Sequence, residues 1–120
     1  MTTTTATQTT ARCARCGRAL TSARALRTGY GPRCYTMVRA AAREAATRHK
    51  PHQIAKAIEL IEDGGVVPTT RAGVYHTVGT NGEIYKTAAT GCTCPAGLTA
   101  RHTCYHRIAV EIVEATRQTV

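Results

Sequence analysis

The sequence predicts a small, zinc-stabilised α+β fold: an N-terminal Cys knuckle with two helices, followed by a ββα unit. Its six Cys fall into two clusters, its first half has helical hydrophobic spacing, and its second half has strand-like alternation around a turn. The 120 residues include five Tyr but no Trp or Phe. Such a chain buries little apolar area, and small scaffolds of this kind usually depend on disulfides or metal ions.

Two helices are expected in the first half, after a Thr-rich stretch over residues 1–10 that predicts a disordered tail. Pro32 suits the first turn of a helix, strong helix formers follow it, and Pro51 ends or kinks that helix near residues 49–50. A second helix over about 52–62 carries Ile54, Ile58 and Ile61 on one face. Glycines at 64 and 65 then stop it.

The second half has the pattern of a hairpin followed by a helix. Residues 74–77 alternate, residues 79–82 read Gly-Thr-Asn-Gly, and residues 83–87 return as a second strand. An amphipathic helix is expected over about 103–117. The glycines at 64–65 therefore divide the chain into a basic helical module, 11–63, and a zinc-finger module, 66–120.

The strongest motif is Cys92-Thr-Cys94-Pro, followed after nine residues by Cys104-Tyr-His106. Three thiolates and one imidazole suit Zn²⁺, which prefers four nitrogen or sulfur ligands in a tetrahedron. We therefore expect Cys92, Cys94, Cys104 and His106 to hold one structural Zn²⁺. His102 is a further candidate, but its place before Cys104 fits a solvent-facing loop better.

The region around this motif, about residues 73–113, resembles a SWIM-type zinc finger. The order and spacing of the ligands, the Cys-Pro-Ala-Gly turn and the Ile-Ala-Val that follows the His all agree, although Tyr105 stands where the family often has Lys. The resemblance implies a β-hairpin before the zinc site, a helix that begins at the last ligands, and a role in binding DNA or protein.

A second cluster contains Cys13, Cys16 and Cys34, within Cys-Ala-Arg-Cys-Gly-Arg-Ala-Leu and Gly-Tyr-Gly-Pro-Arg-Cys. About residues 11–36 resemble a short Cys-rich module of unknown function from actinobacterial and phage proteins. The three Cys predict either a second Zn²⁺ with an unidentified fourth ligand or three reduced thiols in a core. On a continuous helix His49 would lie far from Cys34, which makes His49 and His52 poor candidates for the fourth ligand. A second helix that returns toward the cluster could bring Asp63 closer to it.

The sequence has no apolar run of signal-peptide or membrane length, which predicts a cytoplasmic protein. The resemblance over about residues 11–36 implies that the cell is a bacterium or a phage-infected host. In a reducing cytoplasm, clustered Cys favour metal over disulfides. No nucleotide-binding or acidic catalytic motif occurs, and residues 12–43 contain no carboxylate. A non-enzymatic protein is therefore expected, because a catalytic zinc usually has an acid or base within reach.

The charge is concentrated in the first half of the chain. Residues 1–56 contain eleven Lys or Arg and one acid, whereas residues 57–120 contain five and six, so an anionic partner is expected for the first half. A solvated surface rich in Arg through coding bias is the alternative. Tyr30 and Tyr35 lie within this region and are candidates for stacking on bases. The predicted nucleic-acid contacts are Arg12, Arg15, Arg18, Arg24, Arg27, Arg33, Arg39 and Arg43.

Two functions follow from these observations. The first is a zinc module that binds nucleic acid, DNA among the candidates, as an accessory or regulatory factor. The second is an adaptor whose finger presents a surface to a larger protein.

Overall fold

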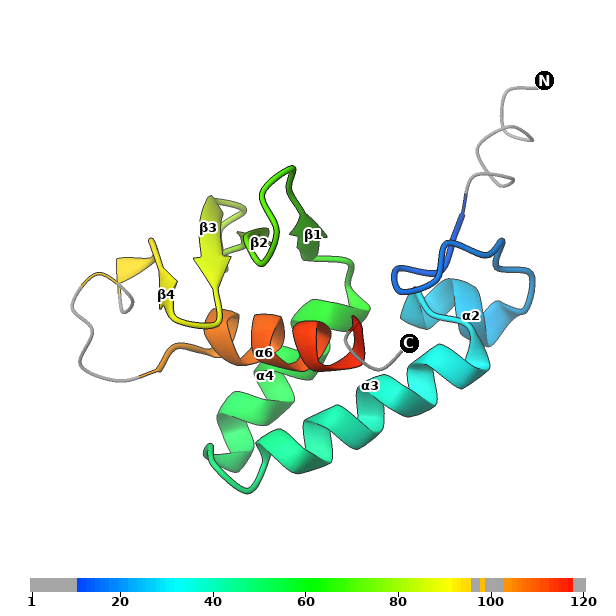
Figure 1. Cartoon of the computed structure of the whole chain (residues 1–120), viewed down its shortest axis with the longest axis horizontal. Coiled ribbons are helices and arrows are strands. Elements are labelled where there is room, and N and C mark those ends of the chain that lie inside the picture. The colour runs from blue at the N-terminus through cyan, green and yellow to red at the C-terminus, as the bar shows by residue number, and fades with distance from the viewer. Residues whose placement is uncertain (1–10, 96–97, 99–102, 118–120) are drawn as a thin grey trace.

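In the computed structural model of the chain, residues 11–95, 98 and 103–117 are described, and the predicted tail over residues 1–10 lies outside them. Within the described residues the protein is a small α+β structure in which helices pack against an antiparallel sheet (Figure 1). The helices are α2 (Ala23–Thr28), α3 (Pro32–Ala45), α4 (Pro51–Glu62) and α6 (Tyr105–Arg117). The strands are β1 (Val66–Pro68), β2 (Tyr75–Val78), β3 (Ile84–Ala88) and β4 (Gly91–Cys92).

Both predicted helices of the first half form, but the first is shorter than expected, because it stops at Ala45 rather than near residues 49–50. Helix α3 begins at Pro32 and ends at Ala45, and α4 begins at Pro51, so each starts with the proline whose missing N–H costs nothing in a first turn. The short helix α2 was not predicted. Ser22 caps its N-terminus by accepting a hydrogen bond from the Ala25 N–H, and Gly29 ends it with a φ of 82°.

The predicted hairpin is the centre of a four-stranded antiparallel sheet with the strand order β1-β2-β3-β4. Tyr75 pairs with Thr87 and Val78 with Ile84 across the β2–β3 hairpin. Two short strands that were not predicted extend this hairpin: β1 pairs with β2, and β4 pairs with the end of β3, where Cys92 lies opposite Thr87.

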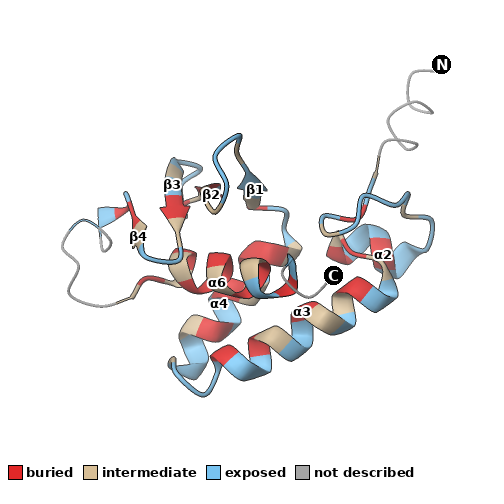
Figure 2. Cartoon of the chain, in the orientation of Figure 1, coloured by how far each residue is buried: buried red, intermediate tan, exposed pale blue. Residues whose placement is uncertain are grey.

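Helix α6 lies between the sheet and the pair formed by α3 and α4 (Figure 1). Ile108, Ala109 and Val110 are three consecutive residues with no exposed surface, so the helix is covered on several sides rather than along one stripe (Figure 2). A single cluster of buried residues reaches from Val38 of α3 to Tyr75 of β2 through this helix. The core therefore crosses the glycines at 64–65, and the division of the chain at that point stays a prediction.

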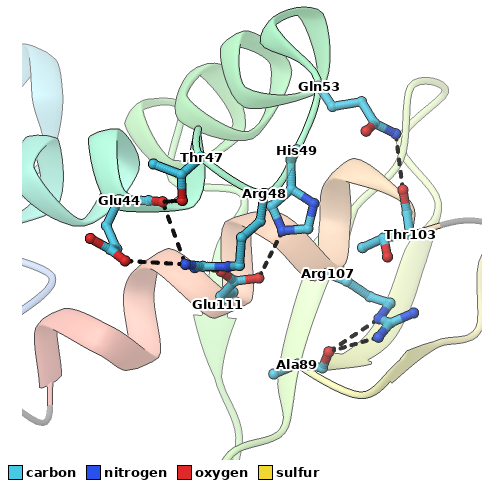
Figure 3. Close-up of polar contacts among 9 residues, drawn as sticks. All are labelled: Glu44, Thr47, Arg48, His49, Gln53, Ala89, Thr103, Arg107 and Glu111. Atoms are coloured by element: carbon cyan, nitrogen blue, oxygen red, sulfur yellow. Dashed lines mark hydrogen bonds and ion pairs between the residues drawn. The ribbon is translucent and has the colours of Figure 1, made fainter.

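Polar contacts from Glu111 tie the turn between α3 and α4 to the middle of α6 (Figure 3). One carboxylate oxygen accepts a hydrogen bond from Arg48, and the other lies 3.1 Å from Nε2 of His49. Burial alone would raise the pKa of Glu111, but the hydrogen bonds from Arg48 and His49 outweigh it and lower that pKa. None of the helices in the described ranges is both long and apolar enough to cross a membrane.

Replacing Glu111 with Gln is expected to destabilise the protein by about 1 kcal/mol at pH 7, since the side chain is partly exposed. A lowered folded-state pKa means that the contribution is complete above the ordinary Glu pKa and is lost as the pH falls through the folded value. Denaturant unfolding of metal-loaded protein measures the change. Glu44→Gln is the matched control, because that carboxylate contacts the same Arg48 but is exposed; an equal loss in both variants would contradict a special role for Glu111.

Candidate metal centre

Cys92, Cys94, Cys104 and His106 come together at the end of the sheet that β4 forms. Their ligand atoms all lie within 4.8 Å of one another, and all four residues are buried. Cys92 ends β4, Cys94 follows it in a turn, and Cys104 and His106 stand at the start of α6. The four residues predicted from the sequence therefore form one cluster with the donor set of a metal site.

The sheet fixes the first two cysteines. The Thr87 Oγ1 lies 3.2 Å from the Cys92 Sγ and 2.8 Å from the Thr77 Oγ1, so two buried hydroxyls on neighbouring strands support this thiol. The backbone N–H of Cys94 donates to the Cys92 Sγ at 3.5 Å. These contacts hold the Cys92 sulfur in place, and the thiolate is the form of cysteine that binds metal.

Two side-chain contacts fix the loops on either side of the cluster (Figure 3). Gln53 of α4 donates to the Thr103 carbonyl at 2.9 Å, immediately before Cys104. The Arg107 guanidinium donates twice to the Ala89 carbonyl, at 3.1 and 3.0 Å, in the turn between β3 and β4. A helix of the first half thus helps to position a site whose ligands all belong to the second half.

The imidazole of His106 is buried without a hydrogen-bond partner at either ring nitrogen. Tyr105 and Tyr85 pack against the ring with centroid distances of 4.2 and 5.3 Å. Burial lowers the pKa of His106, and the Val78 backbone opposes this shift more weakly. The ring is therefore held in the neutral form that coordinates metal. Because buried polar atoms are nearly always paired, and a metal ion would take one of the two unpartnered nitrogens, the ring fits a site built for a metal ion.

A positive charge among the thiols of this cluster would stabilise their ionised forms. Burial raises the pKa of Cys104 to about 12, and the neighbouring Cys92 and Cys94 add to the rise. The Arg107 backbone N–H acts in the opposite direction. A divalent cation in the middle of the cluster removes this electrostatic cost, because it stabilises the thiolates and releases their protons.

Cys13, Cys16 and Cys34 form a second cluster. The N-terminal segment that precedes α2 is drawn in blue on the right of Figure 1, on the opposite side from β4. The Sγ atoms of the three cysteines also lie within 4.8 Å of one another; Cys13 and Cys34 are buried, whereas Cys16 is exposed. The turn between Cys13 and Cys16 is closed by a hydrogen bond of 2.9 Å from the Gly17 N–H to the Cys13 carbonyl, with Gly17 at a φ of 78°. Cys34 stands in the first turn of α3.

Backbone donors surround the Cys13 thiol. Burial alone would raise its pKa, but the backbone groups of Cys16, Gly31 and Arg15 together lower it to about 7. Burial raises the pKa of Cys34, and a hydrogen bond from Arg15 offsets part of this rise. The cluster therefore favours at least one thiolate near neutral pH, and it too has donors for a metal ion.

Arg15 belongs to this cluster rather than to a free surface. Its Nη1 donates to the Cys34 Sγ at 3.6 Å, and its Nε donates to the Thr116 carbonyl at 2.9 Å, near the end of α6. This contact was not predicted, because Arg15 and Thr116 lie 101 residues apart in the sequence. The remaining predicted nucleic-acid contacts are all exposed: Arg12, Arg18, Arg24, Arg27, Arg33, Arg39 and Arg43.

The expectation that Tyr30 stacks on a base is wrong. Tyr30 is only 5% exposed and belongs to the main core, and its burial raises its pKa to about 12. Tyr35 is partly exposed: the Arg24 guanidinium lies 6.0 Å from its ring centroid, and its hydroxyl donates to Glu62 at 2.6 Å.

The structure brings no fourth ligand to the N-terminal cluster within the described residues. His49 contacts Glu111, and His52 lines a pocket beside the other cluster. Asp63 is exposed at the end of α4. His102 lies outside the described residues.

A family model described as a family of unknown function, DUF6011, matches residues 3–39. The match contains Cys13, Cys16 and Cys34, and it confirms that this segment is similar to a module of unknown function. The match does not reach residues 73–113, where the resemblance to a SWIM-type finger stays a prediction. No curated protein and no solved structure matches the chain significantly.

Proposed function

We propose that the chain is a non-enzymatic zinc protein that binds nucleic acid through its basic first half. The observation that carries the zinc assignment is the buried cluster of Cys92, Cys94, Cys104 and His106, with both nitrogens of the imidazole unpartnered. Three thiolates and one imidazole complete the tetrahedral shell that structural zinc prefers. A metal ion with four protein ligands has no open coordination position for a substrate, which favours a structural role.

The three Cys of the N-terminal cluster are proposed to hold a second Zn²⁺. Thiolate ligands select soft or borderline ions, and zinc is the common choice at a knuckle of this kind. The absence of any carboxylate from residues 12–43 of the sequence leaves this metal without a nearby acid or base, which supports a structural role here as well.

The proposed partner rests on charge and exposure. The lysines and arginines of residues 1–56 exceed the acids by ten, and the seven exposed arginines named above belong to this part of the chain. Arg39 and Arg43 are four residues apart on α3, where Val38 and Ala42 face the core, so the two guanidiniums share the solvent side. Guanidiniums arranged in this way bind phosphates regardless of sequence and with strong salt dependence.

The double variant Arg39→Gln/Arg43→Gln tests the nucleic-acid proposal. If both residues contact phosphates, affinity for a mixed-sequence 20-nucleotide DNA or RNA falls about tenfold near 0.1 M salt. The slope of log affinity against log salt also becomes shallower by about 2. Fluorescence anisotropy of single- and double-stranded probes measures both quantities and ranks DNA against RNA.

The matched control is Arg71→Gln/Lys86→Gln, which removes the same charge from two exposed residues of the second half. Affinity should change little in this control. Equal losses in the two double variants would show that overall charge alone drives binding, and no binding by the native chain would reject the proposal.

The second candidate function, a protein-interaction adaptor, is favoured by two exposed apolar side chains in the second half of the chain. Ile84 on β3 and Leu98 are 61% and 73% exposed. If the native chain binds no nucleic acid, loss of a protein partner on replacing both with Ser would support this candidate.

A further inference from the structure

The N-terminal cluster opens onto a pocket of about 520 Å³. All three Cys line it, and the pocket gives solvent access to the cluster at Cys16, which is exposed, whereas Cys13 and Cys34 are buried. The C-terminal cluster differs, because its four ligand residues are all buried. The two sites therefore differ in both the number of protein donors and their accessibility.

The chain supplies three donors to this pocket and has little from which to supply a fourth. Residues 1–43 contain no His, Asp or Glu, and Cys13, Cys16 and Cys34 are their only Cys. Among the residues that the structure does not describe, His102 is the single His, Cys, Asp or Glu. In the sequence it precedes Cys104, a member of the other cluster, by two residues. Met37, whose thioether is a weak donor, also lines the pocket.

The surroundings of the pocket are positive. Arg15, Arg18 and Arg33 line it, and none of the described residues that line it carries a carboxylate. A zinc ion with three thiolates carries one net negative charge, which the three guanidiniums exceed. The N-terminus of the 14-residue helix α3, which has no acidic residue in its first turn, adds partial positive charge beside Cys34.

We propose that the metal of the N-terminal cluster completes its coordination shell with an anionic donor from outside the chain, held by the arginines of the pocket. Zinc bound by three protein ligands keeps a position for an external ligand, and the charge of this pocket selects an anion. A thiolate and an oxyanion such as phosphate share this chemistry. The inference rests on the proposed metal binding at Cys13, Cys16 and Cys34.

Cobalt substitution tests the inference, because the visible bands of Co²⁺ report its ligands directly. The full chain is loaded with two Co²⁺ under anaerobic conditions and titrated with azide, a small anionic ligand. The bands are expected to shift and to saturate with azide. The Cys16→Ser variant, whose remaining cobalt sits in the C-terminal cluster, is expected not to respond.

A pair of variants separates the pocket from charge in general. Arg18→Gln/Arg33→Gln is expected to weaken azide binding about fivefold while cobalt content stays unchanged, since each exposed charge contributes modestly. Arg39→Gln/Arg43→Gln removes the same charge outside the pocket and should leave azide binding as it is. Competition by inorganic phosphate or by 2-mercaptoethanol then tells an oxyanion from a thiolate.

Three results would overturn the inference, and they are distinguishable. Two bound Co²⁺ whose spectrum ignores azide, phosphate and thiol would show a closed site. A spectrum that changes in Met37→Leu before any ligand is added, without a response to azide, would assign the fourth ligand to that thioether. One Co²⁺ per native chain would reject the N-terminal metal itself, and with it the second zinc of the proposed function.

Discussion

Replacing Cys92 with Ser is expected to remove one zinc per chain and to unfold the protein. Metal binding contributes about 10–16 kcal/mol in zinc-finger peptides, which matches or exceeds the roughly 5–15 kcal/mol that separates a typical domain from its unfolded state. Without the metal, the buried thiols of Cys94 and Cys104 and the unpartnered imidazole of His106 remain between the end of the sheet and the start of α6. Circular dichroism together with the zinc content measures the outcome.

Cys16→Ser is the control for this variant. It also removes a predicted zinc ligand, but Cys16 is exposed, and it lies in the other cluster. We expect this variant to lose one zinc and to keep its helical signal. A Cys92→Ser chain that retains full zinc and a native spectrum would show that the C-terminal cluster is not the metal centre that stabilises the fold.

The second large effect is expected in the core. Ile108 is fully buried on α6, between the sheet and the helices α3 and α4, so Ile108→Ala should cost about 3 kcal/mol through lost burial and the cavity left behind. Denaturant unfolding with excess zinc in every sample measures this loss. Ile84→Ala makes the same chemical change at a residue that is 61% exposed, and it should cost about 1 kcal/mol or less.

Comparable losses at Ile108 and Ile84 would contradict the placement of α6 at the centre of the fold. The comparison is informative because the sequence indicated only an amphipathic helix at this position. The near-complete burial of consecutive residues 108–110 arises because elements from both halves of the chain cover the helix.

Local signals in the sequence were enough to place the longer elements. Pro32 marked the start of α3, Pro51 marked the boundary between α3 and α4, and the turn at residues 79–82 marked the hairpin. These signals act within a few residues, so they do not depend on the rest of the fold. The small α+β fold class was confirmed for the same reason, whereas a SWIM-like architecture stays a prediction.

The elements that were not predicted are short and depend on contacts elsewhere. Strands β1 and β4 have three and two residues, too few for an alternation pattern, and each forms by pairing with the hairpin. Helix α2 has six residues. In its case the sequence did contain signals, since Ser22 and Gly29 are the cap residues that a short helix requires.

The residues of the candidate site were predicted from the sequence, but their contacts with the surrounding structure were not. Metal chemistry restricts donors to a few residue types at characteristic spacings, so the seven Cys and His residues that the two clusters bring together could be identified. The contacts of Arg15 with Cys34 and Thr116, and of Gln53 with the backbone before Cys104, join distant segments. Tyr30 was misassigned because exposed arginines lie three residues away on either side, at positions 27 and 33, whereas its own side chain points into the core.

The zinc content of the reduced, purified chain tests the central claim most directly, measured as metal per polypeptide in the native protein and in Cys16→Ser. The two clusters predict two zincs in the native chain and one in the variant, where the buried site of Cys92, Cys94, Cys104 and His106 keeps its metal. A native chain without zinc, or a Cys16→Ser chain that loses all of it, would contradict the assignment of that buried site.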